Sequence, residues 1–141
     1  MTQDNFLFEW HNPSHGGSRT DANTIRITVT KSKDRRSQLS IRIYEDVMLA
    51  MRWVCGDRVS VGFDFNRKLI AIKRNSADGY LLSASADTKE KRTENEGTHS
   101  ISVVKMQAPD QMVEAIDGPL VIDFGECTDS NGVLIVPFSE G

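Results

Sequence analysis

The sequence lacks any long apolar run, and no segment approaches the roughly 20 consecutive apolar residues that a membrane-spanning helix requires. Residues 1–17 have neither the basic n-region nor the apolar h-region of a secretory signal peptide. We therefore expect a cytoplasmic protein that does not associate with membranes. The chain has 141 residues, 38% hydrophobic and 26% charged, which is enough for one globular domain with a real core.

Cysteine and histidine are scarce. The two cysteines, Cys55 and Cys127, match no C-x-x-C metal or redox spacing. A disulfide between them is disfavoured in a reducing compartment, so we expect two small buried apolar side chains. His11 and His15 would share one face of a helix, but Pro13 lies between them, and no metal site is predicted.

The motifs of common active sites are also missing. There is no Gly-rich phosphate loop, no H-E-x-x-H and no G-x-S-x-G. We interpret Glu45, Asp46 and Asp64 as helix-capping and turn residues, and His99 as a surface residue. Without a nucleophile and base paired by a motif, the sequence predicts a protein that is not an enzyme and needs no cofactor.

Charge is divided unequally along the chain. Residues 1–75 carry 13 Lys/Arg against 8 Asp/Glu, whereas residues 76–141 carry 4 against 12, so the halves have net charges of +5 and −8. One interpretation is that the basic half binds an anionic partner. The other is that the two halves attract each other, within one chain or between two.

Alternating apolar and polar residues predict two strands over 24–30 and 38–43. We expect them to pair as a hairpin around a basic loop, which carries Lys31, Lys33, Arg35 and Arg36. Such a loop suits a phosphate backbone, because neutralised phosphates release counterions. The alternative is a solvated hairpin tip whose charge keeps the protein soluble.

Residues 44–53 predict a short helix, with Val47, Met48 and Met51 at the spacing of a core-facing stripe and Gly56 as its stop. Residues 57–64 and 69–73 then predict a second hairpin, with a turn at Asn66.

Further along the chain, residues 79–84 predict a short strand and residues 85–98 a polar, solvent-exposed linker. The remaining expectations are a strand over 99–105, a helix over 109–116, a strand over 120–124 and a strand over 133–138 after an Asn-Gly turn.

The order strand, helix, hairpin therefore occurs twice, over 38–74 and 99–138, with an offset of 61 between residues 59–63 and 120–124. We expect a flexible arm over 1–23 and one domain over 24–141, made of repeats 24–84 and 99–138 joined by the linker 85–98. The predicted fold class is mainly β with two short helices, barrel-like and pseudo-duplicated.

The run Gly56-Asp57-Arg58-Val59-Ser60-Val61, after a helix with an acidic first turn and before Ile70-Ala71-Ile72-Lys73, resembles the swapped-hairpin module of AbrB/SpoVT and MazE-type transition-state regulators and antitoxins. The likeness covers residues 39–73 well and residues 101–136 weakly. The family's helix opens with a proline-led turn, which Pro109 of the second repeat matches and Tyr44 of the first does not.

The resemblance implies a small regulator that binds double-stranded DNA, and a homodimer in which hairpins exchange. The expected DNA-binding residues are the cations of the basic half: Arg26, Lys31, Lys33, Arg35, Arg36, Arg42 and Arg52. The alternative is a protein-binding inhibitor or adaptor of the phage or accessory-element type, acting through the acidic half or an exposed hairpin.

Overall fold

The computed structural model describes residues 21–32, 36–75, 77–86, 88–116 and 118–138. Of the expected N-terminal arm, only the 3-10 turn η2 (Asp21–Asn23) falls within these ranges. His11, His15, Lys33 and Arg35 lie outside them.

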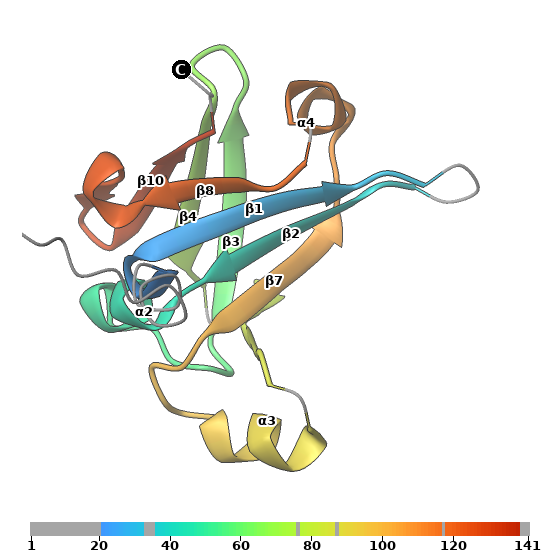
Figure 1. Cartoon of the computed structure of the whole chain (residues 1–141). Helices are drawn as coiled ribbons and strands as arrows, with labels where there is room; N and C mark the ends of the chain where they lie inside the picture. Colours follow the sequence, from blue (N-terminus) through green and yellow to red (C-terminus); the bar gives the residue numbers. More distant parts are fainter. Residues whose placement is uncertain (1–20, 33–35, 76, 87, 117, 139–141) are drawn as a thin grey trace, which may run out of the picture.

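The fold is mainly β, with its strands in two antiparallel sheets (Figure 1). The first sheet has the order β6 (Ser83–Ala84), β7 (Ser102–Gln107), β2 (Gln38–Ile43), β1 (Thr24–Thr30), β8 (Leu120–Asp123). The second has the order β5 (Tyr80–Leu81), β3 (Arg58–Asp64), β4 (Leu69–Arg74), β10 (Val133–Pro137), β9 (Thr128–Ser130). In Figure 1, β1 and β2 pass in front of β3 and β4 and cross them steeply.

The core lies between the two sheets. The predicted alternation is confirmed in the first sheet, where the inward residues of β1 and β2 are buried: Ile25, Ile27, Val29, Leu39, Ile41 and Ile43. The second sheet contributes Ile70, Ile72, Leu134 and Val136 from β4 and β10. Each fully buried side chain of this size stabilises the fold by about 1.5–3 kcal/mol relative to an exposed one.

Both sheets are connected by short segments at their edges. Edge strands β5 and β6 belong to different sheets and are separated only by Leu82, which is 0% exposed. On the other side, β8 and β9 are joined through the 3-10 turn η3 (Phe124–Glu126). A chain that changes sheets at a corner is typical of steeply crossed sheet packing. The described strands form two separate sheets and not one closed barrel.

Helix α2 (Glu45–Met51) buries Val47, Met48 and Met51, as predicted. Its end differs from the prediction, because the left-handed C-cap is Arg52, with φ 61°, and its N–H donates to the carbonyls of Leu49 and Met48. Gly56 is also left-handed, but it lies in the following turn. The sequence predicted that Gly56 stops the helix, but the observed C-cap lies four residues before Gly56.

The predicted linker contains a third short helix, α3 (Lys89–Asn95), which the sequence analysis missed. None of its residues is buried, so it has no apolar stripe to reveal it. Its first turn is capped by Thr88, whose hydroxyl accepts a hydrogen bond from the N–H of Lys91 at 3.1 Å. The sequence predicted two short helices, whereas the described residues contain three.

The C-terminal half contains the predicted helix as α4 (Asp110–Ala115), which follows Pro109. The Asn-Gly turn is confirmed between β9 and β10, where Asn131 and Gly132 both have positive φ. Strands β3 and β8, which the offset of 61 aligns, lie in different sheets. The duplication therefore remains a prediction drawn from the sequence pattern.

The C-cap of α2 gives a test of the fold. We expect Arg52→Gly to raise the free energy of unfolding by about 0.5–1 kcal/mol, because glycine adopts a left-handed conformation without a Cβ penalty. Urea unfolding followed by circular dichroism measures the change. The control is Arg67→Gly, at a turn position without positive φ. Destabilisation by Arg52→Gly would contradict the assigned cap.

Candidate nucleic-acid interface

Two of the predicted DNA-binding arginines lie side by side on the outer face of the first sheet. In the β1–β2 register, Arg26 is directly opposite Arg42. Residues paired in this way have Cβ atoms about 4.5–5.5 Å apart on the same face of a sheet. Their neighbours in the row are Val121 of β8 and Val103 of β7. The hairpin thus concentrates two positive charges at one place.

No counter-charge within the described chain neutralises this pair. Neither guanidinium forms a hydrogen bond or ion pair with a described residue. Among the strands of the first sheet, only β8 carries a carboxylate, Asp123, and it lies opposite Thr24. Like charges directly opposite on a sheet are destabilising, so an anionic ligand would relieve a repulsion that the fold leaves in place.

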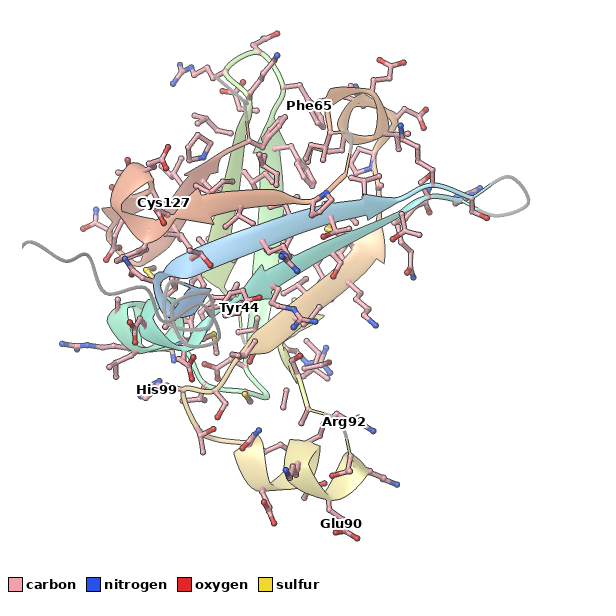
Figure 2. The ribbon with its side chains drawn as sticks, viewed as in Figure 1. Tyr44, Phe65, Glu90, Arg92, His99 and Cys127 are labelled. Carbon is pink, nitrogen blue, oxygen red and sulfur yellow. The ribbon has the colours of Figure 1, made fainter. Side chains whose placement is uncertain are left out.

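The rest of this outer face is polar and basic. Moving along the strands from the arginine pair, the next row joins Thr28, Ser40 and Lys105. The row after it joins Thr30, Gln38 and Gln107. We call these outward side chains of β1, β2 and β7, from the arginine row to this last row, the basic sheet face. Tyr44 lies next to it, where β2 leads into α2 (Figure 2).

The other predicted cations are spread more widely. Lys31 and Arg36 belong to the hairpin beyond the ends of β1 and β2, and Arg36 donates from Nη1 to Oε1 of Gln107 at 3.1 Å. Lys33 and Arg35 are outside the described residues. Arg52 is exposed at the end of α2 and does not come from the sheet.

Sequence reasoning missed Lys105, which belongs to the acidic half of the chain. Strand β7 pairs with β2 along its whole length, so Lys105 is directly opposite Ser40. Its position on an alternating strand was visible in the sequence. The strand order that joins it to the basic half was not, because pairing partners far apart in the sequence leave no local signal.

The outer face of the second sheet differs in character. Its central rows carry Leu69, Ala71, Val133 and Ile135, all half-buried, with Lys73 at one end. An apolar face of this kind does not suit a phosphate backbone, so the two sheets present chemically different surfaces.

The residues that carry the family resemblance have structural roles here. Gly56 has φ 100°, and Oδ2 of Asp57 accepts a hydrogen bond from the N–H of Val54 at 3.0 Å. Asp57 also forms an ion pair with Arg74, with 3.6 Å between Oδ2 and Nη1. The Gly-Asp pair therefore fixes the turn between α2 and β3.

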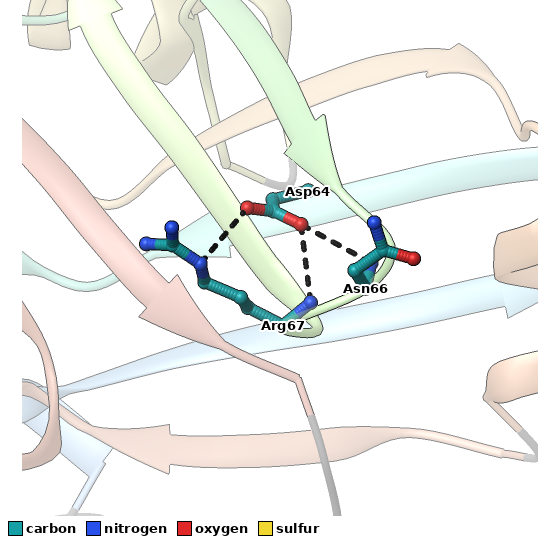
Figure 3. A network of polar contacts seen from close by, with 3 residues as sticks. All are labelled: Asp64, Asn66 and Arg67. Carbon is teal, nitrogen blue, oxygen red and sulfur yellow. Dashed lines mark hydrogen bonds and ion pairs between the residues drawn. The ribbon is translucent and has the colours of Figure 1, made fainter.

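The predicted turn role of Asp64 is confirmed (Figure 3). Its Oδ1 accepts hydrogen bonds from the backbone N–H groups of Asn66 and Arg67, both at 3.1 Å. Its Oδ2 lies 3.6 Å from Nε of Arg67. This carboxylate organises the β3–β4 turn and is engaged there.

The two cysteines are free thiols, and their environments differ. Cys55 is buried, as expected, and its Sγ lies 2.9 Å from Oγ of Ser102, which is also buried. Cys127 is only half-buried. Burial raises the pKa of the Cys127 thiol to about 11, and the carboxylates of Glu126 and Asp123 act in the same direction.

The described residues show no other reactive arrangement. Nδ1 of His99 donates to the backbone carbonyl of Trp53 at 2.7 Å. No group of three or more His, Cys, Asp or Glu within the described ranges is placed to hold a metal ion. Among the same residues, no helix is long and apolar enough to cross a membrane.

Comparisons with protein-family models, with curated proteins and with solved structures found no match to this chain.

The opposed arginines give a stability prediction. We expect Arg42→Thr to raise the free energy of unfolding by about 0.2–1 kcal/mol at low salt, because it removes a like-charge contact and introduces a good strand former. The gain should shrink at high salt, where the repulsion is screened. Denaturant unfolding at two ionic strengths measures both. The control is Lys73→Thr on β4, which faces Ser60 and Val133. Equal effects in the two variants would show that the arginines do not repel each other.

The raised pKa of Cys127 predicts slow alkylation. At pH 8, iodoacetamide should label Cys127 in the native protein about 100-fold more slowly than in the unfolded chain, since the thiolate is the nucleophile. The rate should climb with pH until about pH 11. Timed labelling with peptide mass spectrometry measures it.

The same shift affects stability with a defined sign. Folding raises the pKa of the Cys127 thiol from 9.0 to about 11. The contribution of this thiol to the free energy of unfolding is therefore fully present below pH 9 and is lost as the pH rises through 11. Native labelling at pH 8 as fast as in the unfolded chain would contradict the assignment.

Proposed function

We propose that this protein is a small regulator that binds double-stranded DNA through the basic sheet face. The observation that carries the proposal is the pair Arg26 and Arg42, which lie opposite each other without a counter-charge among the described residues; Arg26 is exposed and Arg42 is half-buried. Arginine guanidinium groups form charge-assisted, bidentate hydrogen bonds with phosphate oxygens. A phosphate backbone would supply the negative charge that this face lacks.

The distribution of the remaining groups supports the same proposal. Lys105 adds a third cation to the face, and Lys31 extends it at the β1–β2 hairpin. Hydroxyl side chains such as Thr28 and Ser40 lie between the cations and are common phosphate contacts. Most protein–DNA hydrogen bonds go to phosphates and sugars, and they orient the protein on the duplex.

The element order is compatible with the family resemblance. Strand β2, helix α2 and the β3–β4 hairpin follow one another as in the swapped-hairpin regulators, with Gly56 and Asp57 before β3. In this chain, β4 pairs with β10 of the same molecule. We propose a regulator related in architecture to that family, with a barrel-like duplicated organisation and homodimerisation as parts of the same hypothesis.

Protein binding is the second candidate, and exposed apolar side chains favour it. Tyr80 and Leu81 on β5 are 43% and 46% exposed. Leu81 lines a pocket of about 290 Å³ between α3 and the β5–β6 corner. Exposed apolar groups beside a pocket are typical of a partner-binding surface. Tight co-purification with a host protein, together with no binding to any duplex, would favour this candidate over DNA binding.

Removing the arginine pair tests the proposed function. We expect Arg26→Ala/Arg42→Ala to weaken binding to a random-sequence duplex. It should also reduce the slope of log K against log salt by about 2, since each lost phosphate contact removes about 0.9. Fluorescence anisotropy across a salt series measures both quantities.

The matched control is Arg67→Ala/Lys73→Ala, which removes the same charge from the β3–β4 hairpin. This control should keep the wild-type slope. An identical loss of duplex affinity and salt slope in both double variants would mean that binding depends only on the net charge of the protein. Absence of wild-type binding at low salt would exclude the proposal.

A further inference from the structure

The first sheet narrows toward the β1–β2 hairpin. Strand β8 pairs only with Thr24–Ile27 of β1, and β6 pairs only with Ser102 and Val103 of β7. Beyond these residues, only β1, β2 and β7 continue, and Figure 1 shows the hairpin extending past the body of the sheet. Neighbouring strands lie about 4.8 Å apart, so the β1–β2 pair at this end is a two-stranded ribbon of the kind that the roughly 12 Å wide major groove of B-DNA admits.

The outward side chains at this narrow end differ from those in the arginine row. Gln38 and Gln107 are exposed and directly opposite each other, with Thr30 next to Gln38. This row is four residues, or about 13 Å, from the arginine row. Amide and hydroxyl side chains are among those that hydrogen-bond to base edges, and glutamine pairs with adenine.

The side-chain amides of Gln38 and Gln107 differ in which hydrogen-bonding groups they have free for a ligand. Oε1 of Gln107 accepts from Nη1 of Arg36 at 3.1 Å, which leaves its NH₂ group to donate to a ligand. The side-chain amide of Gln38 has no hydrogen-bond partner among the described residues. It can therefore both donate and accept, which is the pattern that matches N7 and N6 of adenine.

The adjoining pocket favours a base edge over a phosphate. It has a volume of about 410 Å³ and is lined by Arg36, Ser37, Gln107 and the acidic residue Asp110. A carboxylate beside the guanidinium would repel a phosphate, whereas a neutral base edge can accept from one group and donate to the other.

We propose that this narrow end enters the major groove of duplex DNA and reads base edges, with Gln38 contacting adenine and Gln107, oriented by Arg36, donating to a base acceptor. The inference rests on the proposed DNA binding and divides the basic sheet face into two parts. The arginine row holds phosphates and sets affinity, while the glutamine row sets sequence preference. Duplex RNA is not a target, because its major groove is too narrow for side chains to read.

The test is selection of preferred sites from a random-sequence DNA duplex pool with the full chain, followed by anisotropy on the enriched and a scrambled duplex. We expect enriched sites to contain fixed A·T pairs. Gln38→Ala should reduce the preference for the enriched duplex over the scrambled duplex about tenfold, and its salt slope should stay that of the wild type because no charge is removed. The control is Gln111→Ala on α4, an exposed glutamine that lines a different pocket, together with Phe65 and Lys68, and this variant should keep the preference.

Three results would overturn the inference and leave DNA binding in place. These are salt-dependent binding without any enriched sequence, an enriched preference that survives in Gln38→Ala/Gln107→Ala, and tighter binding to an RNA duplex of the enriched sequence than to the scrambled DNA. Failure of the wild-type chain to bind any duplex would instead reject the proposed function itself.

Discussion

The antiparallel register of β1 on β2 determines both which side chains the first sheet buries and which it presents on its outer face. It pairs Ile25 with Ile43 and Ile27 with Ile41, so that the inward faces of both strands fill the core. The same register places Arg26 against Arg42 on the outside. A slip of one residue in either strand would bury charge and expose isoleucine. Burial of the core therefore determines where the positive charge is held.

The second sheet supports this arrangement from behind. Its buried residues on β4 and β10 face the isoleucines of the first sheet, and Leu82 and η3 connect the sheets at opposite sides. The outer face of the first sheet is thus backed by a packed core. A rigid sheet holds side chains in place more precisely than a loop does, which lowers the conformational cost of binding a ligand on that face.

Local patterns in the sequence predicted local structure well, and long-range pairing was beyond them. The alternation over 24–30 and 38–43 predicted both strands with their observed limits, and Asn131-Gly132 predicted a hairpin. Lys105 was missed because its neighbour Ser40 is remote in the sequence. Helix α3 was missed because it buries no side chain. The corner at Leu82 was missed because the single strand predicted over 79–84 is in fact two strands, β5 and β6, which belong to different sheets.

We propose that the basic sheet face binds duplex DNA, and its contacts can be mapped residue by residue. The most direct measurement is an NMR titration of the isotopically labelled chain with a short random-sequence duplex at low salt. We expect amide shift changes concentrated in β1, β2 and β7, which weaken as salt is added. Shift changes confined to β3, β4 and β10, or no changes at all, would contradict it.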